Sequence, residues 1–589
     1  MALSLPWTLP TPIPQAAADA AARAHQLAHP VVAAILLGRG IAGDGISPYL
    51  APDIATLHAP GALARIDDAA AAIDAAIGRG EKITVYGDYD VDGTTGAALL
   101  VSYLRSKGAE ADAYIPMRQD GYGLSAEAIE AIARERRPKL LLTVDCGTSS
   151  REEAALARSI GIEVVVTDHH RPVEGKITEG IVVNPHMAGD ASPNKGIAGV
   201  AVGWKLVSAL HGSHPTANMD LVAIGTVADV MPLTGENRPI VRAGLTRLAH
   251  THRPGMAALL RVAGRGAVAE PCRHGASFCA VCGKGAVCAH EAPHCFRVTA
   301  ESISFDIAPR INAIGRMGLD PNMVVELFLT GDRARADEIA TLIDTTNTER
   351  KAQTQALTDE AIRRANPEDP VIVVQMDLFK GVAGLVAGRL ASEFGRPAIV
   401  VDAEGHGSAR SVKGIDLLRV LQDECADLVG AAGHAVAMGI KECADPAALA
   451  ARLRLRAWPD TIAARSLTID AVIRLTDVTA PLVGAMEVME PTGEANPAPL
   501  LAIGGLTVKR RKLMGAEGRH VRYTLADLTS GRTIEAIHFF GGPDALAEGT
   551  SVDVAGRPTL DTHPRFGTRL EWRVRAIRPS SAPLPPTIA

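Results

Sequence analysis

Several common features are scarce or missing in this sequence. Aromatic residues make up only 3% of its 589 residues, and no apolar run approaches the about 20 residues that span a bilayer. The N-terminal stretch MALSLPWTLPTPIPQ has no basic region ahead of an apolar one, unlike a signal peptide. These absences argue against a membrane protein and a secreted protein. They predict a cytoplasmic protein that does not associate with membranes.

A general excess of positive charge is also missing, since the net charge is −6 and the isoelectric point is about 6.3. Any binding to nucleic acid must therefore depend on local basic patches. One patch is predicted at residues 501–580, where 13 lysines and arginines stand against 8 acidic residues. The rest of the chain then carries −11, so a basic C-terminal module is joined to an acidic body.

Length and residue pattern divide the chain into several domains. A chain of 589 residues is too long for one hydrophobic core. Residues 1–75 are rich in alanine and predict a helical cap on the next domain. Residues 76–330 and 367–490 predict two α/β lobes, and residues 331–366 predict one long helix that joins them. Residues 495–580 contain about five short alternating strands, which predict a small β-barrel such as the OB-fold.

Acidic and imidazole side chains come directly after the predicted strands of the first lobe. Continuous β-branched runs at residues 83–87, 140–144, 164–167 and 181–183 predict a parallel sheet covered on both faces. The residues at the ends of the first three runs are Asp88, Asp90, Asp92, Asp145, Asp168, His169 and His170, and Asp229 comes later in GTVADV. Because ligands of open α/β sheets bind beyond the carboxyl ends of the strands, we expect these side chains to meet at one edge.

This cluster predicts a metal site. So many carboxylates side by side would repel one another unless cations neutralised them. Mixed carboxylate and imidazole ligands suit Mn²⁺ or Mg²⁺ better than a metal that prefers thiolates. Two such ions, about 3.5–4 Å apart, can hold an attacking water and a phosphoryl oxygen. The alternative, that every acid is a turn or cap residue, explains single positions but not all four segments together.

The segments GDYDVDG, VDCG, TDHH and GTVADV, in this order, resemble the motifs of the DHH phosphoesterases. The segments YIPMRQDGYGLS, IAPRINAIGR, GSARS and GHAVAMG are similar to the RecJ branch in particular, and the resemblance covers roughly residues 35–578. It implies a DHH domain, a DHHA1 domain and an OB-fold. It also implies a metal-dependent 5′–3′ exonuclease that hydrolyses single-stranded DNA to 5′ mononucleotides in DNA repair and recombination.

The same resemblance assigns roles to the cluster. The implied ligands of two Mn²⁺ or Mg²⁺ ions are Asp90, Asp92, Asp145, His169 and Asp229, with Asp88 close to a ligand position. Asp145 would bridge the two ions. Asp168 would orient His169, and His170 would face the scissile phosphate.

Further residues are implied to hold the DNA. Arg118, Arg310, Ser408 and Arg410 would form a pocket for the 5′-terminal phosphate, since arginine binds phosphate in a bidentate way. Gly433 and His434 would lie near the DNA backbone, and the Tyr122 ring would stack on a base or pack internally. In the barrel, the candidates are Lys509, Arg510, Arg511, Lys512, Arg519 and Arg522 with the aromatic residues Tyr523, Phe539, Phe566 and Trp572. About half of these aromatic rings should be barrel core, because strand residues alternate between the two faces.

Two features depart from the family pattern. A Cys-rich insertion at residues 264–298 contains Cys272, Cys279, Cys282, Cys288 and Cys295 together with His274, His290 and His294. It predicts a structural zinc site; a flexible loop and an iron–sulfur cluster are the alternatives. Leu378 and Phe379 stand where the family usually has Trp-His, and Ala432 replaces a glycine, so DNA contacts of the second lobe are affected.

Two other functions fit part of the pattern. The first is a DHH phosphodiesterase for short oligonucleotides or cyclic dinucleotides, against which the C-terminal barrel argues. The second is a non-catalytic, Cdc45-like replication scaffold, against which the complete set of metal ligands argues. The expected partners of an exonuclease are single-stranded DNA with a 5′ end, a single-strand-binding protein and a RecQ-type helicase, and the expected state is a monomer.

Overall fold

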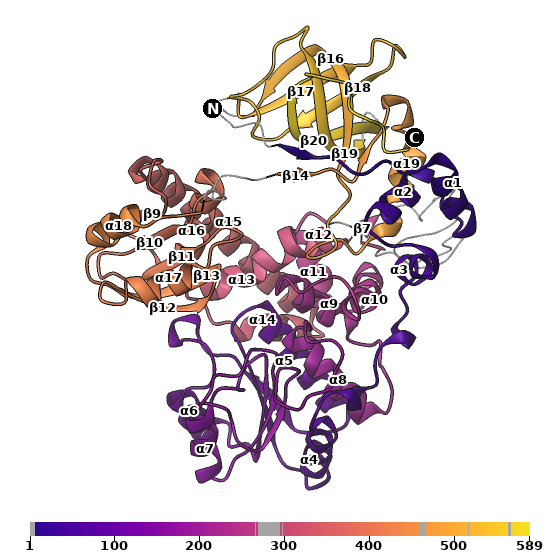
Figure 1. Ribbon diagram of the computed structural model, residues 1–589. Coiled ribbons are helices and arrows are strands. Elements are labelled where there is room, and N and C mark those ends of the chain that lie inside the picture. Colours follow the sequence, from indigo (N-terminus) through magenta and orange to yellow (C-terminus); the bar gives the residue numbers. More distant parts are fainter. Residues whose placement is uncertain are drawn as a thin grey trace.

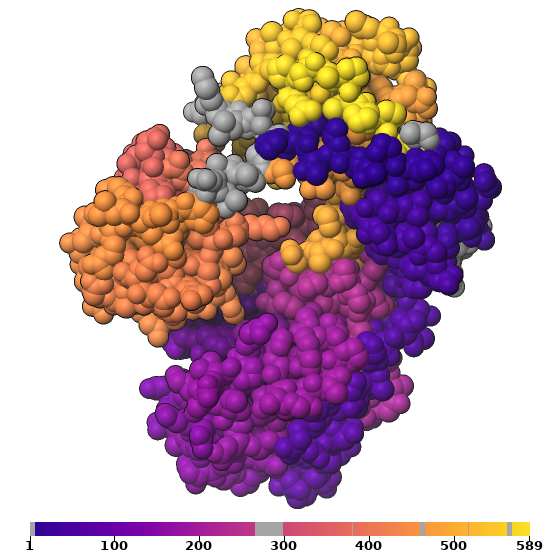
Figure 2. Space-filling model, in the orientation of Figure 1, coloured from indigo at the N-terminus to yellow at the C-terminus, as the bar shows by residue number. Residues whose placement is uncertain are grey.

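The computed structural model of the chain describes residues 6–265, 267–268, 295–296, 298–459, 466–515, 518–563 and 567–588. A lower lobe, a second lobe to its left and a barrel above them surround the centre of the molecule (Figure 1). The long helix α15 (Arg333–Arg364) joins the two lobes, as predicted for residues 331–366. In the space-filling view, an opening separates the second lobe from the barrel and the N-terminal helices (Figure 2).

The first lobe is built on a five-stranded parallel sheet with the order β3-β2-β4-β5-β6. Its strands are β2 (Ile83–Gly87), β3 (Ala111–Tyr114), β4 (Leu140–Val144), β5 (Glu163–Thr167) and β6 (Ile181–Val183). Strand β4 shows why the sheet is covered on both faces. Leu140 and Leu142 belong to the core formed with α4, α5 and α8, whereas Leu141 belongs to the core formed with α6 and α7. The parallel sheet is therefore confirmed, and β3 is the strand that the sequence pattern did not reveal.

Helices and short turns complete this lobe. They are η2 (Ile54–Thr56), η3 (Pro60–Ala62), α4 (Ile66–Gly78), α5 (Val91–Ser106), η4 (Arg118–Asp120), α6 (Ala126–Glu135), α7 (Arg151–Ser159), α8 (Gly199–His211), α9 (Met219–Ala228), α10 (Asn237–Ala249), α11 (Pro254–Val262), α12 (Ala300–Ser302), η5 (Ile303–Ile307), α13 (Ala308–Arg316) and α14 (Asn322–Leu329). The short strands β7 (Ala267–Val268) and β8 (Cys295–Phe296) pair at the base of the Cys-rich insertion. The side chains of its five cysteines lie outside the described residues, so the predicted zinc site stays a prediction.

The second lobe has a mixed sheet with the order β12-β13-β11-β10-β9. Its elements are β9 (Ile372–Gln375), η6 (Lys380–Val382), α16 (Ala383–Phe394), β10 (Ala398–Val401), β11 (Gly407–Arg410), α17 (Leu417–Glu424), β12 (Val429–His434), β13 (Ala437–Cys443) and α18 (Pro446–Leu455). Only β9 and β10 are parallel; the other pairs are antiparallel, so the lobe has an α/β fold with one hairpin edge.

The C-terminal unit is a closed five-stranded barrel, because β16 pairs with β17 on one side and with β19 on the other. Its strands are β16 (Leu501–Met514), β17 (His520–Ala526), β18 (Thr533–His538), β19 (Ser551–His563) and β20 (Gly567–Pro579). Short elements precede them: β14 (Leu467–Thr468), β15 (Ala471–Val472), η8 (Leu475–Asp477), α19 (Ala480–Met486) and η9 (Glu487–Met489). The predicted OB-like barrel is thus confirmed.

The N-terminal segment differs from the expected cap on the first lobe. Its elements are β1 (Trp7–Thr8), α1 (Gln15–Ala24), α2 (Pro30–Gly38), η1 (Gly43–Gly45) and α3 (Ile46–Leu50). Val32, Ile35 and Leu36 share one hydrophobic core with the barrel, and β1 pairs with β14. Only α4 joins the core of the first lobe. A helical pattern reveals that a face is apolar but not which distant surface covers it, so the sequence could not place these helices.

The buried Arg238 forms hydrogen bonds between the first lobe and the segment that precedes the barrel. Arg238 on α10 donates hydrogen bonds to the backbone oxygens of Met489, Glu490 and Pro491, and its guanidinium lies 3.8 Å from the ring centroid of Tyr49. Burial lowers its pKa to about 10. Carbonyl oxygens stabilise its charge in place of a carboxylate.

Among the described residues, no single helix has the length and apolar character needed to cross a membrane. The bent pair Pro30–Gly38 and Gly43–Leu50 passes that test together by length and composition only.

Candidate metal and nucleic-acid site

The acidic residues lie where the strands of the first lobe end. Strand β2 runs directly into Asp88, and Asp90 then caps α5 by accepting hydrogen bonds from the backbone N–H groups of Asp92 and Gly93. Asp145 comes directly after β4 with a φ of +63°, a conformation that is rare for a non-glycine residue and that occurs at functional sites. The sheet therefore delivers the carboxylates to one edge, as the strand pattern predicts.

Asp92 and His169 lie at the centre of this cluster. The two carboxylate oxygens of Asp92 accept hydrogen bonds from the N–H groups of Gly199 and Val200, at 2.6 and 2.8 Å, at the start of α8. The Nε2 atom of His169 lies 3.1 Å from Asp145, 3.5 Å from Asp229 and 3.8 Å from Asp92. Side chains from β4, β5, α5 and α9 thus converge within a few ångströms.

The second histidine is held by a separate set of contacts. His170 Nδ1 lies 2.9 Å from Asp168 and 2.7 Å from the hydroxyl of Tyr122. Asp168 also accepts hydrogen bonds from the backbone N–H groups of His169, His170 and Thr148. Asp168 therefore contacts His170 through its side chain, whereas the prediction from sequence was that it orients His169.

Burial and mutual repulsion shift the pKa values of the cluster. Burial, followed by the neighbouring carboxylates, raises the pKa of Asp92 to about 7 and that of Asp229 to about 8. The same two causes hold the pKa values of Asp88 and Asp145 well above their usual range. Burial lowers the pKa of His169 to about 4, so its imidazole is neutral and able to bind a metal ion at neutral pH. For His170, burial acts to lower the pKa, but the hydrogen bond to Asp168 outweighs it and raises the pKa to about 9.

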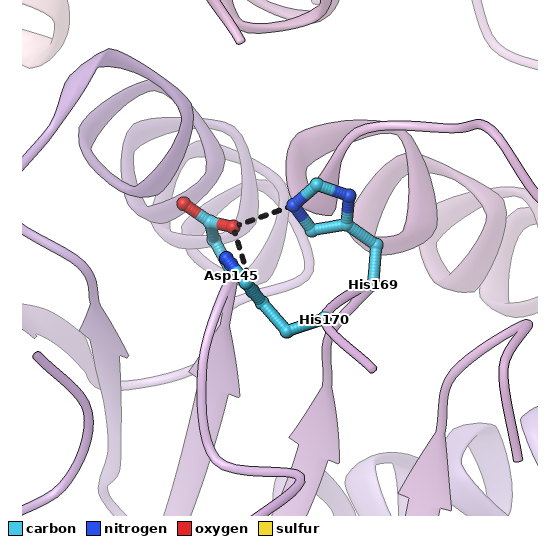
Figure 3. Close-up of side chains that lie close together, drawn as sticks. All are labelled: Asp145, His169 and His170. Atoms are coloured by element: carbon cyan, nitrogen blue, oxygen red, sulfur yellow. Dashed lines mark ion pairs between the residues drawn. The ribbon is translucent and has the colours of Figure 1, made fainter. Parts of the chain in front are cut away.

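These residues fit divalent cations. Four buried atoms have no hydrogen-bond partner: one oxygen each of Asp88, Asp145 and Asp229, and Nε2 of His169. Such atoms are costly to bury unless a ligand satisfies them. Together with neighbouring side chains they form three overlapping groups able to hold an ion: Asp88–Asp90–Asp145, Asp145–His169–His170 and Asp92–His169–Asp229. In Figure 3, the side chains of His169 and His170 both point toward Asp145, which belongs to two of these groups and contacts both histidines.

A cluster of arginines lies beside the acidic residues. Its members are Arg118, Arg316, Arg350 and Arg410, and it is called the arginine cluster below. Burial and the charges of the other three lower the pKa of Arg316 to about 9. Burial and the charge of Arg118 likewise lower the pKa of Arg410. In the part of the chain that the structure describes, no ion pair joins any member to a carboxylate. Positive charges without a carboxylate partner are suited to bind an anion such as phosphate.

The arginine cluster shares only Arg118 and Arg410 with the predicted phosphate pocket. Arg310 is engaged elsewhere: its guanidinium donates to Asp344 at 2.9 Å and to the backbone oxygens of Asp306 and Val262. Arg316, six residues later on α13, lies in the cluster in its place and donates to the backbone oxygen of Gly381. The sequence motif IAPRINAIGR contains both arginines, and the prediction from sequence names Arg310 alone for the phosphate pocket. Arg350 was missed because the long helix was interpreted through its apolar positions only.

The second lobe places its predicted DNA contacts along neighbouring strands. Arg410 on β11 and His434 on β12 are both aligned with Ala437 of β13, so the two side chains lie on the same face of the sheet. Ser408 lies two residues before Arg410 on the same strand. Gly433 has a φ of +138°, and a Cβ there would lie 2.8 Å from the backbone oxygen of Ala437, so only glycine fits.

The barrel divides the predicted aromatic residues between core and surface. Tyr523 and Trp572 are fully buried, whereas Phe539 is 48% exposed; Phe566 lies outside the described residues. Phe540, which the sequence pattern did not single out, is 76% exposed, and both phenylalanines contact His520. The side chains of Lys509, Arg510, Arg511 and Lys512 are exposed on β16. The barrel therefore presents exposed cations and exposed aromatic rings.

Fold and site together define a phosphoesterase of the DHH class. Residues 82–226 match the DHH family, N-terminal domain, and residues 469–568 match the RecJ OB domain. The chain belongs to the RecJ family. Its similarity to the single-stranded-DNA-specific exonuclease RecJ of Thermus thermophilus is 33% identity over 537 residues, which covers 90% of this chain and 72% of that protein. The RecJ of Bacillus subtilis is 32% identical over 556 residues, which covers 90% of this chain and 66% of that protein.

Solved structures agree with this membership. RecJ from Thermus thermophilus in complex with Mn²⁺ has a TM-score of 0.79 and 28% identity, and the match covers 99% of this chain and 81% of that one. An exonuclease RecJ bound to manganese has a TM-score of 0.56 and 31% identity, with 69% of this chain and 98% of that one covered.

Proposed function

We propose that this protein is a metal-dependent exonuclease that hydrolyses single-stranded DNA from its 5′ end and releases 5′ mononucleotides. One observation carries the proposal: buried carboxylate oxygens and one imidazole nitrogen converge without hydrogen-bond partners next to unpaired arginines. A cation-binding centre beside an anion-binding one is what the cleavage of a phosphodiester requires. Relatives named single-stranded-DNA-specific exonuclease RecJ support the choice of substrate.

The metal ligands that we propose are Asp88, Asp90, Asp92, Asp145, His169 and Asp229, with Asp145 between the two ions. Mn²⁺ and Mg²⁺ are the ions named in the related RecJ structures, and both suit oxygen-rich sites. When bound, two such ions stabilise the charge that develops on the phosphoryl group and lower the pKa of water.

The remaining residues bind and orient the DNA. The arginine cluster holds the 5′-terminal phosphate. Because Arg118 is close enough to Asp88 for its charge to act against the burial that raises the pKa of this carboxyl, a phosphate bound there places the first phosphodiester near the acidic residues. Asp168 holds Nδ1 of His170, so that Nε2 can donate to a phosphate oxygen when the ring is protonated. The exposed cations and rings of the barrel bind the rest of the strand without regard to sequence. This surface favours strands over dinucleotides as substrates.

The test uses purified protein, Mn²⁺ and four substrates: single-stranded DNA with a 5′ phosphate, the same strand with a blocked 5′ end, a blunt duplex and a dinucleotide. We expect loss of the open single strand only, with release of mononucleotides, and no activity in Asp145→Ala. Cleavage of the dinucleotide alone would favour the short-oligonucleotide phosphodiesterase. Inactivity with every divalent ion would favour the scaffold.

The finer assignments are part of the same proposal. They are the domain limits 331–366, 367–490 and 495–580, a place in the cytoplasm in DNA repair and recombination, and action as a monomer beside a single-strand-binding protein and a RecQ-type helicase. A structural zinc ion in the Cys-rich insertion is proposed from its C-x-x-C pair and neighbouring histidines. Elemental analysis should then find about one zinc per chain, and Cys279→Ser with Cys282→Ser should remove it.

A further inference from the structure

Tyr122 belongs to a loop that contacts the acidic residues at two places. At the start of residues 117–125, the guanidinium of Arg118 lies 4.8 Å from the ring centroid of Tyr89, which is flanked by Asp88 and Asp90. Further along, the Tyr122 hydroxyl lies 2.7 Å from His170 Nδ1 and 3.2 Å from the backbone oxygen of Asp145. The loop therefore connects the arginine cluster with the second histidine.

The hydrogen bonds of Tyr122 have one consistent assignment. The backbone oxygen of Asp145 can only accept, so the single hydroxyl proton of Tyr122 is donated to it. At His170, the hydroxyl oxygen therefore accepts from Nδ1–H, which also faces Asp168 at 2.9 Å. Two acceptors hold Nδ1, and they fix the ring so that Nε2 is the nitrogen available to a substrate.

The backbone of the loop directs this hydroxyl inward. Gly121 and Gly123 on either side of Tyr122 have φ values of +98° and +89°. Residues with a Cβ adopt such conformations only at an energetic cost. Tyr122 remains 50% exposed even though its hydroxyl is engaged, so the ring lies at the surface and the oxygen in the site. The hydroxyl and the ring can therefore be tested separately.

We propose that the Tyr122 hydroxyl is a positioning group for His170, and that the loop couples binding of the 5′ phosphate by Arg118 to this positioning. The inference rests on the exonuclease function proposed above. It assigns to Tyr122 a role through its oxygen, distinct from stacking on a base.

Tyr122→Phe separates the two roles because it keeps the ring and removes the oxygen. We expect kcat on 5′-phosphorylated single strands to fall by about 10- to 100-fold, the scale of a misplaced catalytic group, with KM changed less than about twofold. Mn²⁺ affinity measured by calorimetry should stay within about twofold, since no proposed metal ligand is altered. Unchanged kcat in Tyr122→Phe, or a rise in KM alone, would overturn the proposal.

A double-mutant cycle tests whether the effect passes through His170. In a His170→Ala background, Tyr122→Phe should have no further effect on residual kcat, because the group that it positions is absent. An equal fall in both backgrounds would show that the hydroxyl acts independently. Tyr86→Phe is the matched control, since the Tyr86 hydroxyl donates to the backbone oxygen of Gly123 in the same loop and does not contact His170. An equal loss in Tyr86→Phe would mean that general loosening of the loop is the cause, which contradicts the proposal.

The coupling is tested with strands that carry a 5′ phosphate or a 5′ hydroxyl. The wild-type protein should show a higher kcat on the phosphorylated strand, and Tyr122→Phe should lose most of that ratio. An equal ratio in both proteins would overturn the coupling. The wild-type arm reports the proposed function by itself: an inactive wild type would refute that function, whereas an active wild type with an unaffected Tyr122→Phe would refute only the role of the hydroxyl.

Discussion

Gly199 at the start of α8 packs directly against Asp145 in the candidate metal site. A Cβ on Gly199 would lie 2.6 Å from the Cβ of Asp145 and 2.7 Å from its Cα, which is too close for any side chain. The backbone N–H of Gly199 also donates to Asp92. One residue therefore allows α8 to approach the two carboxylates closely enough to hold both in place.

Gly199→Ala should displace Asp145, because the clash is with backbone and Cβ atoms that cannot rotate away. We expect a loss of about 1–3 kcal/mol in the free energy of unfolding from overpacking. Calorimetry should also show Mn²⁺ affinity reduced by about tenfold or more, as with other changes to groups that hold metal ligands. Gly203→Ala, one turn later on α8, is the control, since its Cβ would meet only ordinary contacts at 3.5 Å or more. Equal Mn²⁺ affinity in both variants would contradict this account.

A buried ion pair behind the site gives a pH-dependent prediction. Lys205 and Glu236 are 2.7 Å apart and buried. Burial acts to raise the pKa of Glu236, but its bonds to Lys205 and His58 outweigh burial and lower it. A lowered folded-state pKa means that the ionised carboxylate stabilises the fold above the unfolded pKa, near pH 4.3, and that this contribution is lost as the pH falls through the folded value.

Lys205→Met leaves the carboxylate buried without its cation. We expect a loss of about 3–5 kcal/mol at pH 7. Because burial alone then raises the pKa of Glu236, protonation relieves the cost, and the deficit should shrink as the pH approaches 4. Thermal unfolding of the wild type and of Lys205→Met from pH 4 to 8 measures this deficit. The double variant Lys205→Met with Glu236→Gln should recover part of the lost stability. A deficit that does not depend on pH would refute the role of this charge.

At the scale of elements, helix α13 directs its two arginines into different surroundings. Arg310 and Arg316 are six residues apart, so their side chains leave the helix in directions that differ by about 120°. One direction leads to Asp344 and the other to the arginine cluster. The two residues share a motif but have separate surroundings.

Matched substitutions should separate the two arginines. Arg316→Gln should raise KM for 5′-phosphorylated single strands by about 10-fold or more, the cost of a lost charged hydrogen bond to phosphate, with little change for 5′-hydroxyl strands. Arg310→Gln should lower the unfolding temperature and affect both strands equally. The reverse pattern in steady-state kinetics would restore Arg310 to the phosphate pocket.

The sequence predicts much of the acidic cluster because Asp88, Asp145 and His169 lie within two residues of a strand end, whereas Asp229 follows helix α9 and was implied by the family resemblance. Asp88, Asp145 and His169 need only the rule that parallel strands deliver their carboxyl ends to one edge. To predict the positions of Arg316 and Arg350, one must know the direction in which each side chain leaves its helix. That direction depends on packing between helices that are distant in sequence. Strand β3 was missed because ADAY is short and half polar. The N-terminal helices were misplaced because their partner lies more than 400 residues away.

At the scale of the whole molecule, the N-terminal helices are part of the barrel's stability. Leu36 on α2 is fully buried in the core shared with the barrel. Leu36→Ala should reduce the free energy of unfolding by about 2–5 kcal/mol, because it removes apolar contacts and leaves a cavity. The loss should concentrate in the barrel, so hydrogen exchange should quicken in β16–β20 more than in β2–β6. Faster exchange confined to β2–β6 would contradict the assignment of these helices to the core of the barrel.

The return of the N-terminal helices to the barrel has a topological consequence. The backbone leads from these helices to the first lobe, through α15 to the second lobe and on to the barrel, where it meets the helices again, and the opening of Figure 2 lies inside this circuit. The circuit is closed without a covalent bond where the N-terminal segment meets the barrel side, through the shared apolar core, the β1–β14 pair and the hydrogen bond from Arg39 to Asp470. A polymer threaded through it could leave past one of its own ends, or by separation of the whole N-terminal segment from the barrel side. A linear single strand can therefore enter the opening by one of its ends. A covalently closed circle of the same sequence has no end and cannot be threaded unless the circuit opens.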